Sequence, residues 1–189
     1  NYGYWSVQVA GKQFGAHRAV AIEAAQSNVP QLDANARLNG GRFEVLHRAV
    51  FSRSGETLQI YGKNHFGLTV APGESGKRNT VQQFMVETIT LDDAGAMLAV
   101  SIGTPLIIKL DVEGAEADAL AGAAALLKRN VLFLYEDERA DEGNGISRHL
   151  MQDLGLDLYA IWPDRFPTIV ASMSDVAEAK RQGLYNFAA

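Results

Sequence analysis

The 189-residue chain contains no cysteine, which excludes disulfides and cysteine-ligated zinc sites. This absence favours a reducing compartment, and we expect a cytoplasmic protein. No apolar run approaches the about 18 residues that a membrane-spanning helix needs, so we expect no membrane partner. Basic residues are in the minority, with 17 Lys and Arg against 22 Asp and Glu and a net charge of −5. Because nucleic-acid-binding surfaces are normally basic, we expect no nucleic-acid partner.

The residues that are present are typical of a globular domain. Hydrophobic residues make up 47% of the chain and charged residues 21%. At roughly 150 residues per domain, the length predicts a single domain over residues 1–189. The chain starts at Asn1 in the middle of a pattern, and we expect this domain to be incomplete at its N-terminus.

Short apolar runs alternate with longer helical patterns along most of the chain. Residues 62–80 are rich in Gly, Ser, Asn and Lys, and this composition and length predict a flexible loop. The predicted helices are 28–39, 91–100, 115–128, 145–154 and 174–182. The predicted strands are 17–24, 43–50, 57–61, 84–90, 105–111, 131–135, 156–162 and 184–188.

This alternation predicts an α/β fold with a doubly wound, mostly parallel sheet and helices on both faces, as in Rossmann-like proteins. The apolar run 106–108 predicts a central strand that is covered on both sides. Ligands of such folds bind beyond the carboxyl ends of the strands. Three predicted strands end in acids at this edge, namely Glu23, Asp111 and Glu136.

Glu23 is a candidate for binding a nucleotide ribose. Gly3 precedes it by twenty residues. In nucleotide-binding βαβ units, a glycine turn is followed at about this distance by an acid that accepts hydrogen bonds from the ribose hydroxyls. The alternative is that Glu23 is an ordinary acid at a strand end.

The segment 109–116 (KLDVEGAE) is the second candidate site. Three carboxylates lie within six positions where a predicted buried strand is followed by a predicted helix, namely those of Asp111, Glu113 and Glu116. The alternative is helix capping, because acids suit the positive end of a helix dipole. Capping does not explain Lys109, a charge inside an apolar strand, which predicts a carboxylate partner or a functional role. The acids also suit a divalent cation, although no zinc signature is present.

At these residues the chain resembles the FkbM family of S-adenosylmethionine-dependent methyltransferases. Residues 107–127 (IIKLDVEGAEADALAGAAALL) match the family's most distinctive segment. Further likenesses are the Thr-Leu-Asp of 90–92, the Ala-Val of 49–50, the Asn-hydrophobic ending at 185–187, and Leu32, Asn35 and Asn39 in a Leu-x-x-Asn-x-x-x-Asn helix.

The resemblance implies a class I methyltransferase fold that binds S-adenosylmethionine. It implies that Glu23 binds the ribose and that the backbone around Ala49 faces the adenine. Ala24, which follows Glu23, is a further candidate cofactor contact, and it stands where the family often has proline. Residues Asn1, Tyr2 and Gly3 correspond to the tail of the family's Gly-Ala-Asn-x-Gly cofactor loop. The family's first strand is absent, so we expect the natural protein to carry it upstream.

The resemblance further implies O-methylation of a hydroxyl on a sugar or another small molecule. It places Asp111 beside the methionine part and the acceptor, as the candidate base. Glu113 or Glu116 would assist it, and Lys109 would stabilise the carboxylates. Residues 62–80 are a candidate for a loop that closes over the acceptor, and plain disorder is the equal alternative.

Two other functions remain open at this point. A non-catalytic binding or scaffold module with a methyltransferase-like fold is one, because the cofactor loop is incomplete. An NAD-dependent oxidoreductase using Glu23 is the other, although no tyrosine is followed four positions later by lysine.

Overall fold

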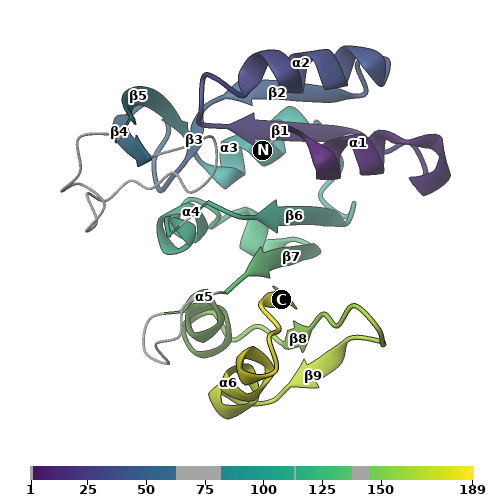
Figure 1. Ribbon diagram of the computed structural model, residues 1–189, viewed down its shortest axis with the longest axis vertical. Coiled ribbons are helices and arrows are strands. Elements are labelled where there is room, and N and C mark those ends of the chain that lie inside the picture. The colour runs from purple at the N-terminus through teal and green to yellow at the C-terminus, as the bar shows by residue number, and fades with distance from the viewer. Residues whose placement is uncertain (1, 63–81, 113, 138–144) are drawn as a thin grey trace. The chain divides into compact units, whose positions relative to one another are not determined.

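A computed structural model of the chain describes residues 2–62, 82–112, 114–137 and 145–189 (Figure 1). It shows a mixed α/β protein with two compact units. The first unit consists of residues 1–102 and 112–128, and the second unit of residues 103–111 and 129–189. The predicted loop at 62–80 lies almost entirely outside the described residues.

The first unit begins with two helical segments and a parallel pair of strands. β1 and β2 pair in parallel, in a register that runs from Ala19 opposite Phe43 to Glu23 opposite His47. The elements are α1 (Tyr4–Ala10), the short 3-10 helix η1 (Lys12–Phe14), β1 (Ala19–Glu23), α2 (Val29–Leu38) and β2 (Phe43–His47).

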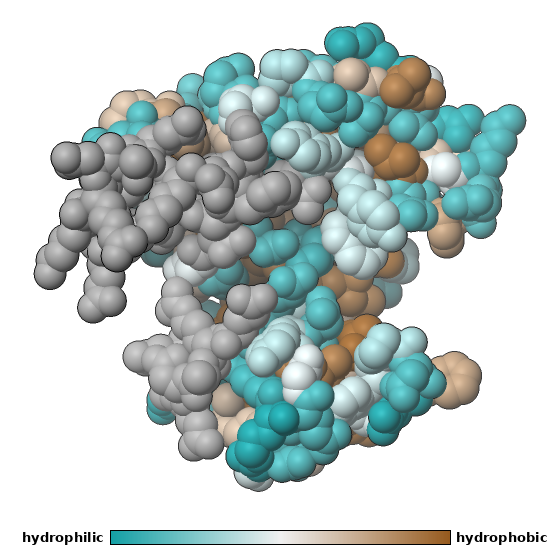
Figure 2. Space-filling model, viewed as in Figure 1, coloured by the Kyte–Doolittle hydropathy of each residue, from teal (hydrophilic) through white to brown (hydrophobic). Residues whose placement is uncertain are grey.

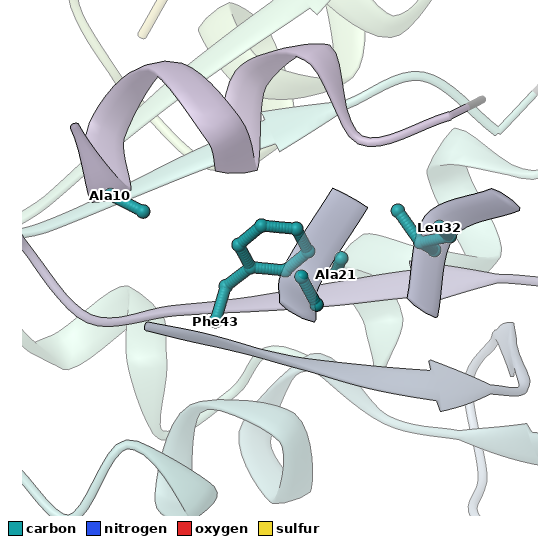
Figure 3. Packing of buried hydrophobic residues seen from close by; sticks show 5 residues of the cluster. Ala10, Ala21, Leu32 and Phe43 are labelled. Carbon is teal, nitrogen blue, oxygen red and sulfur yellow. The ribbon is translucent and has the colours of Figure 1, made fainter. Parts of the chain in front are cut away.

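A small apolar core holds these elements together. Figure 3 shows the Phe43 side chain extending from β2 beside Ala21 of β1, with Leu32 of α2 nearby. The fully packed members of this core are Ala10, Ala21, Leu32, Ala36 and Phe43. Alanine at three of the five positions allows the helices to lie close to the strands.

A second sheet of the first unit has the strand order β3-β5-β4. β3 pairs in parallel with β5, and β4 pairs with β5 in antiparallel register. The predicted single strand 43–50 is wrong, because Arg48 separates β2 from β3 and its N–H donates to the Glu23 carbonyl (3.2 Å). The bounds are β3 (Ala49–Val50), β4 (Thr57–Gly62) and β5 (Gln82–Ile89).

The predicted helix over residues 115–128 is also wrong in its extent. It is split into α4 (Glu116–Ala121) and η3 (Leu126–Lys128), which follow α3 (Leu91–Met97) in the first unit. At Gly122 a Cβ would lie 2.5 Å from the Phe51 carbonyl oxygen. The Asp92 carboxylate accepts hydrogen bonds from the N–H groups that start η3. A close backbone contact and a side-chain cap therefore divide the helix.

The second unit contains one five-stranded sheet in the order β6-β7-β10-β8-β9. β6 and β7 are parallel, and the other pairs are antiparallel. β9 was not expected from the sequence. The elements are β6 (Leu106–Leu110), β7 (Val131–Glu136), α5 (Ile146–Arg148) with the π-helical turn η4 (His149–Asp153), β8 (Leu158–Ala160), β9 (Thr168–Val170), α6 (Met173–Arg181) and β10 (Asn186–Ala188).

Aromatic stacking and a buried ion pair stabilise this unit. Tyr135 and Phe187 stack with ring centroids 5.9 Å apart. Burial raises the pKa of the Tyr135 hydroxyl well above its usual range, and this hydroxyl shares a hydrogen bond with Ser147 (3.1 Å). The Lys180 ammonium donates to the buried Asp137 carboxylate (2.6 Å). Figure 2 shows the outer face of α6 as hydrophilic, in keeping with its exposed polar residues Ser174, Asp175, Glu178 and Arg181.

The α/β class is confirmed, but the described strands do not form one doubly wound parallel sheet. They form three sheets, in which β1–β2, β3–β5 and β6–β7 are the parallel pairs. β6 lies at the edge of its sheet rather than in the centre, and Ile107 is 67% exposed. Among the described residues, no helix has the length and apolar character to cross a membrane.

Candidate functional site

Tyr2 and Gly3 are held against helix α2. Gly3 precedes α1 in the left-handed conformation (φ 85°), and a Cβ there would lie 2.5 Å from Leu32 Cδ1. The Asn35 side chain donates to the Tyr2 carbonyl (2.7 Å), and Asn39 donates in turn to the Asn35 carbonyl (2.8 Å). The spacing of Leu32, Asn35 and Asn39 thus has a physical role, which is to fix the Tyr2-Gly3 turn. Asn1 lies outside the described residues.

Glu23 is the last residue of β1 and is only 8% exposed. Its Oε1 accepts a hydrogen bond from the Ala25 N–H (2.8 Å), so the chain turns toward the carboxylate directly after the strand. A buried carboxylate needs hydrogen-bond donors around it. The arrangement places an acid with fixed orientation at the carboxyl end of a parallel strand, where nucleotides bind in α/β proteins.

Ala24 and Ala49, both predicted cofactor contacts, belong to one packed group. Ala24 packs against the cluster of Ala49, Ile60 and Val86. Ala49 is itself 6% exposed and pairs with Thr88 of β5. The structure therefore brings the chain after β1 and the start of β3 together within the first unit.

Lys109, Asp111 and Glu136 form an ion-pair group in the second unit. The Lys109 ammonium lies 3.6 Å from Asp111 Oδ2 and 3.5 Å from Glu136 Oε1. The Lys109 side chain is 16% exposed, whereas the Asp111 and Glu136 side chains are 42% and 38% exposed. The lysine stem can lie along the apolar strand while its ammonium reaches the strand end. The predicted carboxylate partner of Lys109 is confirmed.

Glu136 is the member of this group to which sequence reasoning assigned no role. β6 and β7 are parallel, and Leu110 lies opposite Tyr135. The residues that follow these two, Asp111 and Glu136, are therefore neighbours across the strand pair. Their side chains point to the same face as Lys109, because side chains two apart along a strand share a face. The signal that was available was the acid at the end of each neighbouring strand.

Glu116 has a local role. Its Oε1 accepts a hydrogen bond from the Gly114 N–H (3.0 Å), which stabilises the turn before α4. Glu116 also stands in the first turn of α4, where an acid suits the helix dipole. Asp111 does not cap α4, because the N-cap is Ala115 and no side chain caps it. Glu113 lies outside the described residues, and Glu116 belongs to the first unit whereas Asp111 belongs to the second.

In the part of the chain that the structure describes, no group of three or more His, Asp or Glu side chains has the geometry to hold a metal ion. Asp111 and Glu136 instead have the Lys109 ammonium between them.

A comparison with protein families identifies the class of this chain as a methyltransferase. The profile of the methyltransferase FkbM domain matches residues 1–163, which include Gly3, Glu23, Ala49 and the 109–116 segment. The chain belongs to the FkbM methyltransferase domain family. The match ends before β9, so the likeness at 185–187 stays a prediction. No curated protein and no solved structure matched the chain.

Proposed function

We propose that this domain transfers the methyl group of S-adenosylmethionine to a hydroxyl of a sugar or another small molecule in the cytoplasm. The family match supports the class of reaction. We further propose a class I methyltransferase fold for the domain, which the parallel pairing of β1 with β2 and of β6 with β7 supports.

Glu23 carries the proposal for the cofactor. Its buried carboxylate is fixed by the Ala25 N–H at the end of β1. A carboxylate in this place is suited to accept hydrogen bonds from two ribose hydroxyls. The backbone of the Tyr2-Gly3 turn and the chain around Ala24 and Ala49 would contact the rest of the nucleoside. The residues present therefore fit the cofactor.

Asp111 is our candidate for the group that receives the acceptor's proton. Bound S-adenosylmethionine supplies an electrophilic methyl carbon, and the acceptor oxygen must be held in line with it at about 3 Å. Asp111 is half-exposed at the strand end, where an acceptor has access to it. A hydroxyl that attacks must lose its proton to a base within hydrogen-bond reach. Lys109 would hold this carboxylate in position.

Calorimetric titration with S-adenosylhomocysteine tests the cofactor assignment. We expect micromolar binding by the unaltered chain, and at least a tenfold loss in Glu23→Ala, since hydrogen bonds to a charged group contribute about 1.5–3 kcal/mol. Glu44→Ala is the matched control. Glu44 lies on β2 in the same sheet, is exposed, and pairs with Arg18.

The control should bind as tightly as the unaltered chain. Absence of heat from the folded, unaltered chain would overturn the cofactor proposal. Binding that is equally strong in Glu23→Ala would leave the cofactor in place and remove Glu23 from its site.

A further inference from the structure

His47 contacts the turn that follows Glu23. It ends β2 directly opposite Glu23, and its Nε2 lies 3.1 Å from the Ala24 carbonyl oxygen. The side chain is partly buried. A lone histidine without ligand spacing gives no signal in the sequence, so only the pairing of the two strands reveals this contact.

The chemistry of the contact determines the proton on the ring. A carbonyl oxygen only accepts hydrogen bonds, so Nε2 must carry a hydrogen and donate it. Both the Nε2-protonated neutral ring and the doubly protonated ring meet this condition. The contact therefore persists whether or not the ring is charged.

The Glu23–Ala25 turn is restrained from three sides. The Glu23 carboxylate accepts a hydrogen bond from the Ala25 N–H (2.8 Å), and the Glu23 carbonyl accepts one from the Arg48 N–H (3.2 Å). The third contact is the hydrogen bond that the Ala24 carbonyl accepts from His47. The first two restraints act on Glu23 itself. His47 acts on Ala24, the residue at which the chain leaves the strand. Without His47, the peptide between Ala24 and Ala25 has one restraint fewer, and the Ala25 N–H orients the carboxylate through this peptide.

We propose that His47 is a positioning residue for the ribose site, which it serves by fixing the Ala24 carbonyl and through it the orientation of the Glu23 carboxylate. The inference rests on the proposed function, because it assumes that Glu23 binds ribose hydroxyls. His47 itself contacts the turn. This positioning role requires a hydrogen-bond donor at the end of β2.

A ligand pair separates this role from a general loss of stability. S-adenosylhomocysteine and its 2′,3′-dideoxy analogue are titrated into the chain in the unaltered form and in His47→Phe and His47→Gln. Phe keeps a ring of similar size without a donor, and Gln keeps an N–H donor. We expect His47→Phe to weaken S-adenosylhomocysteine about fivefold to tenfold, as one lost hydrogen bond would. His47→Gln should recover most of the affinity.

The 2′,3′-dideoxy analogue should bind His47→Phe and the unaltered chain with nearly the same affinity, because it lacks both ribose hydroxyls that Glu23 would bind. An equal loss for both ligands would mean that His47 only supports the fold, and would overturn the proposal. Unchanged S-adenosylhomocysteine binding in His47→Phe, with binding lost in Glu23→Ala, would overturn it and leave the cofactor site intact. If the unaltered chain binds neither ligand, the proposed function itself fails. His149→Phe is the control, since His149 pairs with Asp153 in the second unit.

Discussion

The carboxylate of Asp93 shows how single side chains set local charge in this protein. The Ser54 hydroxyl donates to Asp93 Oδ2, and Thr90 caps α3 by accepting the Asp93 N–H (3.1 Å). Side-chain hydrogen bonds to the carboxylate, that of Ser54 first and that of Thr90 second, hold the pKa of Asp93 below its usual value. A lowered pKa in the folded state means that ionised Asp93 stabilises the fold above the unfolded-state pKa of about 4. This contribution is lost as the pH falls through the folded-state pKa.

We predict that Ser54→Ala raises the pKa of Asp93 toward its usual value. The physical reason is that the ionised form loses its strongest donor, while the neutral form loses little. A pH titration of the Asp93 carboxyl carbon by NMR measures the change. Ser52→Ala, which alters a serine two residues from Ser54, is the control and should leave the pKa of Asp93 unchanged. An unchanged Asp93 titration in Ser54→Ala would contradict this account of the pKa.

At the same scale, the sequence predicted some site residues and missed others. A lysine inside an apolar strand needs an opposite charge, so a carboxylate partner for Lys109 followed from the sequence. The identity of Glu136 as a second partner did not, because it depends on the register of β6 with β7. His47 was missed for the same reason, since its contact lies across the β1–β2 pair.

At the scale of elements, Asp92 joins two helical segments that are distant in sequence. It stands in the first turn of α3, and its carboxylate accepts the N–H groups of Ala125 (2.9 Å) and Leu126 (2.8 Å). The Thr-Leu-Asp signature thereby acquires a structural role. Thr90 caps its own helix, and Asp92 caps the start of η3.

We predict that Asp92→Ala lowers the free energy of unfolding by about 1–2 kcal/mol, the usual cost of losing a helix cap. Chemical denaturation followed by circular dichroism measures the change. Asp33→Ala is the control, because Asp33 is in α2 and its side chain makes no hydrogen bond among the described residues. Asp92→Ala should not change the affinity of the chain for S-adenosylhomocysteine, which we assign to the Glu23 turn. A loss of stability no larger than that of Asp33→Ala would refute the cap.

Elements with strong local signals were predicted well, and those that depend on distant contacts were not. Helix α2 agrees closely with its predicted range, since Pro30 in its first turn and the glycines that follow it are local signals. Residues 115–128 have strong helix formers throughout, yet the helix breaks where Gly122 meets Phe51 and where Asp92 caps η3. Propensity cannot reveal such contacts, because they join segments more than thirty residues apart.

At the scale of the whole molecule, the second unit depends on one buried ion pair. The Asp137 side chain is 1% exposed, and Lys180 lies 2.6 Å from it. Asp137 also accepts the Ser147 N–H, so it links β7 with α5 and α6. Removal of the lysine would leave a buried charge without its partner, at a cost of roughly 3–5 kcal/mol.

We therefore predict that Lys180→Ala weakens the second unit selectively. Hydrogen exchange should become faster in β7, β10 and α5, while the amides of β1 and β2 keep their protection. Lys128→Ala, which removes an exposed lysine of η3, is the matched control and should change neither unit. Equal loss of protection in both units of Lys180→Ala would show that the ion pair supports the whole chain rather than its own unit.

The sequence by itself determined the α/β class, most strand and helix positions, the FkbM likeness, and the acids that end three strands. These are local properties, because periodicity, capping residues and motif spacing need no distant contact. The tertiary structure decided which strands pair, that β6 lies at a sheet edge, and that helix 115–128 is divided. It also decided the partners of Lys109 and the contact of His47 with Ala24. Each of these depends on strand register or packing, which bring together residues that the chain separates.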